Sequence, residues 1–194
     1  MKNVLTDKST LSVGDIITTN LSVAVWIVDD YTKSNPIGNV LVTIMDGSLK
    51  AVKNPSGYYV LNDLEAGKYE VVIESDFYFL HKQWVIIPHL DKMMPVVEIT
   101  VTPKPCYPFP RYATLVRGVV SSTPQKVSPI ANEDVEMAGW SLKTKTDKKG
   151  EFVFYFKAVK VENITIQVRG VKKPVKVGIE KKGEKISVGV ITFP

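Results

Sequence analysis

The sequence predicts an all-β protein made of two tandem β-sandwich domains joined by a Pro-rich linker. Three observations predict it. Short segments rich in β-branched residues are bounded by Gly, Pro, Asn or Asp. No window sustains the 3.6-residue apolar period of a long amphipathic helix. A set of motifs also recurs later in the chain, and 194 residues are enough for two such copies, each with its own core.

The predicted strands of the first copy are short and apolar. The clearest are residues 23–28 (VAVWIV), 40–44 (VLVTI), 69–73 (YEVVI) and 96–101 (VVEITV). Their length and their β-branched content are typical of strands in a sandwich.

The repeat is visible as a constant spacing between the two halves of the chain. Residues 35–39 (NPIGN) match residues 128–132 (SPIAN), and Gly57 matches Gly150, each pair 93 positions apart. The matched positions further include Tyr59 with Phe152, Leu61 with Phe154 and, after a shift of two, Tyr69, Val71 and Ile73 with Ile164, Ile166 and Val168. We interpret the two halves as two copies of one β-domain.

The repeated stretch NPSGYYVLNDLEAGKYEVVI (residues 54–73) predicts its own local structure. Gly57 supplies the backbone freedom of a tight turn, after which Tyr59 and Leu61 face the core. Leu64 is expected to close one end of the sandwich, and Gly67 to turn the chain into the next strand. On that strand Tyr69, Val71 and Ile73 point inward and Glu74 points outward.

Domain boundaries follow from the proline content. Four prolines lie within residues 103–110, and such a run is stiff and lacks strand donors. We therefore expect an N-terminal arm (residues 1–20), a first β-sandwich domain (21–102), a Pro-rich linker (103–112) and a second β-sandwich domain (113–194). Within the arm, residues 11–17 (LSVGDII) have weak strand character and could add to a sheet edge, their own or a neighbour's.

The motifs of the repeat, NPIGNVLVTI with NPSGYYVLNDLEAGKYEVVI and then SPIANEDVEM with TDKKGEFVF, resemble those of carboxypeptidase regulatory-like domains, which have a transthyretin-like (Ig-like) β-sandwich fold. The resemblance covers most of residues 20–102 and 113–193. The second copy departs from it, because residues 156–168 lack the Leu-x-x-Gly-x-Tyr element. Such domains are appended to many unrelated proteins, so the resemblance implies a fold and no reaction.

Catalytic and cofactor motifs are missing from the sequence, so we expect no enzyme and no cofactor. His81 and His89 are the two histidines, and no His-x-x-Glu zinc pair, nucleotide-binding glycine cluster or Gly-x-Ser-x-Gly occurs. We therefore predict no catalytic and no metal-binding residue. Cys106 lies in the proline run without a nearby base, as expected of an incidental thiol. In similar collagen-adhesin repeats a buried acid assists a Lys–Asn cross-link, but Glu74 is expected to face outward.

Charge and hydropathy narrow the classes of partner. The net charge of +5 arises from −2 in residues 1–112 and +7 in residues 113–194. A Lys-rich, solvated face explains this asymmetry, and no aromatic–Arg recognition module accompanies it, so we do not expect nucleic acid as a partner. No segment has the ~18 apolar residues of a membrane span, and we expect no membrane insertion. The absence of a secretory signal predicts cytoplasmic synthesis, with function in an assembled or extracellular particle.

Residues 76–95 (DFYFLHKQWVIIPHLDKMMP) form the most unusual segment. As a strand it would be apolar on both sides, whereas a strand with one solvated face alternates. Either the linker and the second domain cover the extra apolar face, with Tyr107 and Phe109 packing there, or another protein does. The candidate partner interface is Phe77, Tyr78, Phe79, Leu80, Trp84, Met93 and Met94.

The sequence favours a non-catalytic structural or adhesive component of a larger assembly, either a phage-tail-like or a cell-surface particle. The expected partners are other proteins of that assembly or further copies of the chain. The alternative is a carbohydrate- or anion-binding module, in which Tyr58 and Trp140 would stack on sugars or the Lys-rich second domain would hold an anion.

Overall fold

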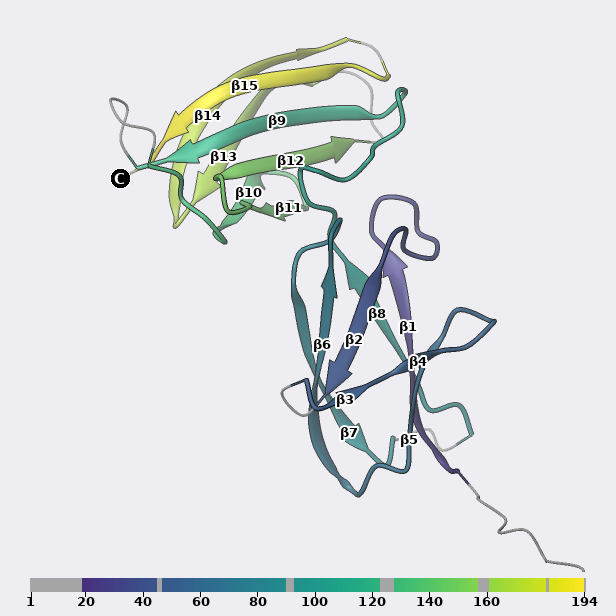
Figure 1. Ribbon diagram of the computed structural model, residues 1–194. Helices are drawn as coiled ribbons and strands as arrows, with labels where there is room; N and C mark the ends of the chain where they lie inside the picture. The colour runs from purple at the N-terminus through teal and green to yellow at the C-terminus, as the bar shows by residue number, and fades with distance from the viewer. Residues whose placement is uncertain are drawn as a thin grey trace, which may run out of the picture.

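A computed structural model describes residues 19–44, 47–89, 93–122, 128–156, 161–180 and 182–193. Within these ranges the chain forms fifteen strands and no helix. The strands make four sheets, two in each half of the chain, and each half has its own cluster of buried apolar side chains. The predicted all-β fold with two tandem β-sandwiches is confirmed, and the two sandwiches follow one another as separate lobes (Figure 1).

The first domain is a sandwich of two four-stranded sheets. One sheet has the order β4-β5-β1-β8 and the other the order β3-β2-β6-β7. Their strands are β1 (Leu21–Asp29), β2 (Val40–Ile44), β3 (Leu49–Lys50), β4 (Val52–Lys53), β5 (Tyr59–Asn62), β6 (Gly67–Ser75), β7 (His81–Ile87) and β8 (Val96–Val101).

The second domain repeats this arrangement with one strand fewer. Its sheets have the orders β12-β9-β15 and β11-β10-β13-β14. Their strands are β9 (Thr114–Ser121), β10 (Asp134–Ala138), β11 (Leu142–Lys145), β12 (Glu151–Phe156), β13 (Val161–Val168), β14 (Val171–Ile179) and β15 (Lys185–Thr192).

Strand pairing confirms the repeat. The first and last strands of each domain run parallel, β1 beside β8 and β9 beside β15, whereas the other strand pairs in both domains are antiparallel. The Gly57 and Gly150 turns both have positive φ, 93° and 75°. The matched side chains that follow them, Tyr59, Leu61, Phe152 and Phe154, are buried as predicted.

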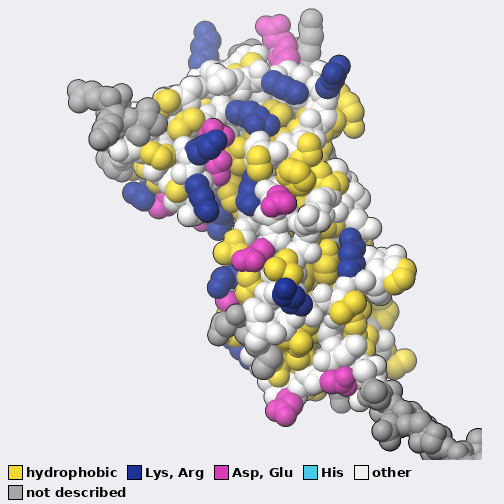
Figure 2. All heavy atoms as spheres, viewed as in Figure 1, with side chains coloured by type: hydrophobic (Ala, Val, Ile, Leu, Met, Phe, Trp, Pro, Cys, Tyr) yellow, Lys and Arg dark blue, Asp and Glu magenta, His cyan; other side chains and the backbone are white. Residues whose placement is uncertain are grey.

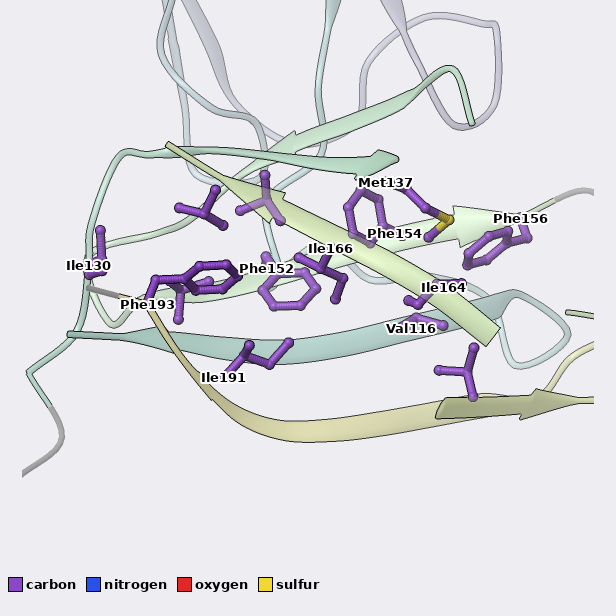
Figure 3. Close-up of a cluster of buried hydrophobic side chains, with 14 of the residues drawn as sticks. Val116, Ile130, Met137, Phe152, Phe154, Phe156, Ile164, Ile166, Ile191 and Phe193 are labelled. Atoms are coloured by element: carbon purple, nitrogen blue, oxygen red, sulfur yellow. The ribbon is translucent and has the colours of Figure 1, made fainter. Parts of the chain in front are cut away.

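The two cores are built from alternate residues of facing strands. In the first domain Val71 and Ile73 of β6 are buried and Glu74 is exposed, as the period-2 pattern predicts. In the second domain Phe152 and Phe154 of β12 lie between the sheets beside Ile164 and Ile166 of β13 (Figure 3). The rings of Phe152 and Phe154 meet edge to face at 5.5 Å.

Two local predictions need correction. Gly67 does not turn the chain, because it already belongs to β6 and pairs with Ile87; the left-handed residue of that connection is Asp63, with φ 54°. Residues 76–80 do not form a strand with two apolar faces. The chain leaves the sheet after Ser75 and makes a single bridge at Tyr78 to Pro103, and β7 begins at His81. The predicted arm lies, up to residue 18, outside the described residues.

A pair of glycine substitutions tests the Gly150 turn. A Cβ at Gly150 would lie 2.6 Å from the carbonyl oxygen of Val120, whereas a Cβ at Gly139, with φ 84°, would meet nothing within 4 Å. Gly139→Ala therefore carries only backbone strain, about 1 kcal/mol, and Gly150→Ala adds steric overlap, for a loss of about 3 kcal/mol in the free energy of unfolding. Urea denaturation of both variants measures the difference. Equal losses would contradict the assigned contact with Val120.

Candidate functional site

The most densely connected polar group among the described residues is the carboxylate of Asp29, at the end of β1. Its side chain is fully buried. Oδ2 accepts hydrogen bonds from the hydroxyls of Tyr78 at 2.9 Å and Tyr107 at 2.6 Å, and Oδ1 accepts one from the backbone N–H of Tyr31 at 2.7 Å. A buried carboxylate is tolerated when donors replace its water. These bonds therefore tie the end of β1 to residue 78 and to the Pro-rich segment.

Burial and the carboxylate together raise the pKa values of the two tyrosines. Tyr78 is enclosed in the core, and burial, countered in part by the hydrogen bond from the N–H of Ile37 and reinforced by Asp29, raises its pKa to about 12. Burial and then the hydrogen bond to Asp29 also raise the pKa of Tyr107. Both hydroxyls thus stay protonated as donors at neutral pH.

An aromatic cluster next to Asp29 joins the two domains. Phe109 of the Pro-rich segment packs against both Tyr31 of the first domain and Tyr155 of β12. The ring centroid of Tyr31 is 5.1 Å from that of Phe109 and 5.5 Å from that of Tyr155, both edge to face. Tyr107 also contacts Phe109, at 4.6 Å. We call Tyr31, Tyr107, Phe109 and Tyr155 the aromatic joint.

Polar contacts cross the aromatic joint as well. The Tyr155 hydroxyl donates to Asp30, and burial followed by this bond raises the pKa of Tyr155. Arg117 Nη1 of β9 donates to the carbonyl oxygen of Pro105 at 2.7 Å, and its guanidinium lies 5.8 Å from the ring centre of Phe109. Beneath the joint, Leu115 and Val153 on the β12-β9-β15 sheet are fully buried. The two domains are therefore in direct contact, with packed apolar and hydrogen-bonded groups between them.

Beside the joint a groove of about 630 Å³ runs between the two domains. Its first-domain wall includes Asp76 and Phe79, and its second-domain wall is the turn with Asp147 and Lys149. Lys104 also lines it on the first-domain side and donates from Nζ to the carbonyl oxygen of Ser75 at 2.6 Å. Charges of both signs line the groove, and Cys106, which also lines it, donates from Sγ to the backbone carbonyl oxygen of Asp76.

The structure divides the predicted partner interface into buried and exposed parts. Tyr78 is fully buried, Phe79 nearly so, and Phe77 is half-buried against the core. These three belong to the domain interior because Tyr78 turns inward to reach Asp29. Of the two explanations for the apolar segment, cover by Tyr107 from within the chain accounts for Phe77 and Tyr78.

The rest of that set is exposed. Leu80 and Trp84 expose 53% and 57% of their surface, and Met93 and Met94 are also exposed. The Lys68 ammonium lies 4.8 Å above the Trp84 ring.

The two residues predicted to stack on sugars do not come together. Tyr58 is half-buried beside Trp26 in the first domain, with ring centroids 6.3 Å apart. Trp140 lies on the second domain, edge to face with Phe156. The structure therefore offers no shared aromatic platform built from Tyr58 and Trp140.

The sequence reasoning missed Asp29, Asp30, Tyr155 and Arg117. A signal for the first two was present, because two carboxylates directly follow the apolar strand residues 23–28. Nothing in the sequence indicated that Tyr155, 125 positions away, would donate to Asp30.

The other side chains with reactive groups are two histidines and one cysteine. In the described part of the chain no three His, Cys, Asp or Glu side chains gather as metal ligands. His81 and His89 are half-buried. Cys106 is exposed, and its Sγ lies 3.4 Å from the carbonyl oxygen of Asp76. The same part of the chain has no helix suited to crossing a membrane.

No protein-family model matches this chain, and no curated protein matches it in sequence. Distant likenesses to solved structures cover most of the chain. They include the shaft pilin SpaA of Lactobacillus rhamnosus GG (11% identity, 90% of this chain and 97% of that one, TM-score 0.34). A second is the minor pilin of Streptococcus agalactiae (12% identity, 89% and 98%, TM-score 0.30).

The chain is also similar to the TIE protein of Bacillus anthracis, with 14% identity and a TM-score of 0.32 over 89% of this chain. It spans 34% of the length of that protein and 61% of a streptococcal ancillary pilin. At these identities and scores the likenesses carry no argument about function.

Replacing Asp29 tests its role as the shared acceptor. Asp29→Ala leaves the buried hydroxyls of Tyr78 and Tyr107 without this partner, and we expect a loss of about 3–5 kcal/mol in the free energy of unfolding. The matched control is Asp134→Ala, which removes an exposed carboxylate 3.7 Å from Lys145 and should change stability by less than about 0.5 kcal/mol. Urea denaturation gives both values, and a loss no greater than that of the control would refute the role.

The raised tyrosine pKa values predict a loss of stability at alkaline pH. The unfolded chain ionises its tyrosines near pH 10, whereas Tyr78 in the fold remains neutral up to about pH 12. The stabilisation is complete below pH 10 and falls as the pH rises towards 12, because only the unfolded state releases the proton; for Tyr78 alone the loss is on the order of 2 kcal/mol. Urea midpoints measured across this pH range test it. Tyr78→Phe should show a shallower decline, and an identical decline would contradict the assignment.

Proposed function

We propose that this chain is a non-catalytic structural or adhesive component of a larger protein assembly, of the phage-tail-like or cell-surface kind. The observation that supports it most is the aromatic joint. A Pro-rich segment that could have been a free spacer instead packs Tyr107 into the first core and Phe109 between the domains. A joint of this kind holds two sandwiches at a fixed spacing and orientation, as a part that transmits or bears load requires.

The joint restricts bending because its contacts differ in kind and direction. Rings pack edge to face across it, Arg117 donates to the backbone at Pro105, and Tyr155 donates to Asp30. Bending at Phe109 would separate these groups together and expose the apolar surface of Leu115 and Val153. Two domains that only needed to be tethered would not require such contacts.

The outer surface also supports a role in protein contact. Large apolar side chains are exposed on the first domain, with Trp84 and Ile86 exposing 57% and 62% of their surface. Lys and Arg side chains are conspicuous on the second domain, at the top of Figure 2. Apolar groups in this setting suit contact with another protein surface.

Recovery of the tagged chain from native lysate tests the proposal. We expect it to elute at a mass several times 21.6 kDa together with other structural subunits, identified by mass spectrometry. The Tyr155→Ala variant removes ring contacts to Tyr31 and Phe109 and the bond to Asp30, and it should reduce recovery of partners about tenfold or more if the fixed geometry matters.

The matched control is Tyr112→Ala, which removes an exposed tyrosine near the joint. Small-angle X-ray scattering should show a larger radius of gyration for Tyr155→Ala than for Tyr112→Ala, with both domains folded. A chain recovered alone as a monomer under all conditions would overturn the proposed function, and sugar or polyanion binding would then favour the alternative of a ligand-binding module.

A further inference from the structure

The strand β7 forms an unprotected edge of the first domain. It is the last strand in the order β3-β2-β6-β7, so in the described part of the chain one of its sides lacks a neighbouring strand. Its outward side chains are Lys82, Trp84 and Ile86, and the last two are more than half exposed. An edge with large apolar side chains offers both backbone hydrogen bonds and apolar surface to an added strand.

The equivalent edge strand of the second domain carries different side chains. Its β14 occupies the corresponding edge of the sheet β11-β10-β13-β14. There the exposed outward side chains are Lys172, Pro174 and Lys176. Charged side chains and proline are the means by which natural sheets prevent edge pairing. Of two equivalent edges in one duplicated fold, β14 carries two lysines and a proline, whereas β7 carries one lysine, Lys82, beside two large apolar side chains.

The neighbouring edge in the first domain is also less suited to pairing. β8 is the edge strand of the facing sheet, β4-β5-β1-β8, and it follows β7 in the chain. The two edge strands therefore lie on the same side of the sandwich. The outward side chains in the middle of β8 are Glu98 and Thr100, which are exposed and polar. The apolar edge on this side is therefore β7 alone.

The N-terminal arm joins the first domain at Asn20, whose position is fixed by hydrogen bonds. Asn20 is held by two hydrogen bonds to Asp63, from Asn20 N to Asp63 Oδ1 at 2.8 Å and from Asp63 N to the Asn20 carbonyl oxygen at 2.9 Å. The eighteen residues before Thr19 can extend about 60 Å, whereas the seven residues of β7 occupy about 23 Å. Residues 11–17 (LSVGDII) alternate in the manner of a strand over part of this length.

The same fixed point argues against pairing within one chain. From residue 17 to Asn20 the backbone spans at most about 10 Å. A strand added to β7 would lie in the opposite sheet, about 10 Å away, and two further strand spacings of about 5 Å to the side. Residues 17 to 20 are too short for this path, so residues 11–17 of the same chain cannot lie along β7.

We propose that the open edge of β7 binds residues 11–17 of a second copy of this chain, which add to the sheet as a fifth strand. Backbone hydrogen bonds supply the pairing. One side of the segment carries Leu11, Val13 and Ile17, interrupted by Asp15, and these three apolar side chains pack beside Trp84 and Ile86. Each copy both donates an arm and accepts one. This inference rests on the proposed function and specifies one partner in the assembly, a further copy of the chain.

Hydrogen–deuterium exchange combined with light scattering tests the pairing on the full chain. We expect the amides of residues 81–87 to be protected in a manner that grows with protein concentration, and the mass to rise towards a multiple of 21.6 kDa. Val13→Pro removes one backbone donor from the arm and should weaken self-association about tenfold or more. Val13→Ala, which keeps that donor, should weaken it less.

A matched pair of tryptophan substitutions tests the accepting edge. Trp84→Lys alters β7, whereas Trp26→Lys alters β1, which lies between β5 and β8 and away from this edge. Only Trp84→Lys should weaken self-association, by about tenfold. Equal effects of the two substitutions would overturn the assignment to β7.

The remaining outcomes are also decisive. The amides of β7 that do not donate to β6 report on an added strand. Concentration-independent protection of these amides, lost in Val13→Pro, would mean that the arm binds its own chain. Unchanged exchange after Val13→Pro would mean that the arm does not bind there; each outcome overturns the inference. A chain that does not self-associate yet is recovered with other subunits would overturn this inference alone and leave the proposed function standing.

Discussion

The buried carboxylate of Asp29 is the constraint on which the rest of the first domain and its connection to the second depend. A carboxylate withdrawn from water needs donors on its accepting positions, and here they come from three separate parts of the chain. Tyr78 must turn into the core to supply one of them, so the chain leaves the sheet after Ser75 and β7 begins only at His81. Tyr107 must do the same, which draws the Pro-rich segment onto the first domain.

The position of the second domain follows from that of Tyr107. Two residues later Phe109 stands at the end of the first sandwich, where Tyr31, held through its backbone N–H by Asp29, presents its ring edge. The outer face of the sheet β12-β9-β15 completes this cluster with Leu115, Val153 and Tyr155. At the 93-residue offset of the repeat, the residue equivalent to Asp29 is Ser122, directly after β9; it is exposed, and its hydroxyl lies 3.5 Å from the carbonyl oxygen of Ser128. This contact joins two nearby parts of the chain, whereas the Asp29 carboxylate joins segments up to 78 positions apart.

The sequence was sufficient for the features that depend on local rules. Gly57 and Gly150 predicted turns with positive φ. The spacing of two between Tyr59 and Leu61, and between Val71 and Ile73, predicted the buried faces of their strands. The spacing of these motifs revealed the duplication. The Asp29 network and the aromatic joint could not be predicted in this way, because they join side chains 49 to 125 positions apart and depend on where the tertiary fold brings them. The prediction for residues 76–80 is wrong for the same reason. Period-2 alternation applies to a strand, but Tyr78 leaves the strand to donate to Asp29, which lies 49 positions away in the sequence.

Duplication gives two sandwiches with the same topology. Features that differ between the two copies are therefore not required by the fold itself and point to other roles. The first copy has a carboxylate hub at the end of its first strand and apolar side chains on the edge strand β7. The second copy has an exposed serine, Ser122, at the equivalent position and Lys and Pro on its edge strand β14. Neither difference is needed to close a β-sandwich core, because each copy closes its core without the device of the other. The Asp29 carboxylate stabilises the connection between the domains. The two edge strands differ in whether they repel or accept another strand. Both differences therefore concern how a sandwich contacts its neighbour, not how it folds.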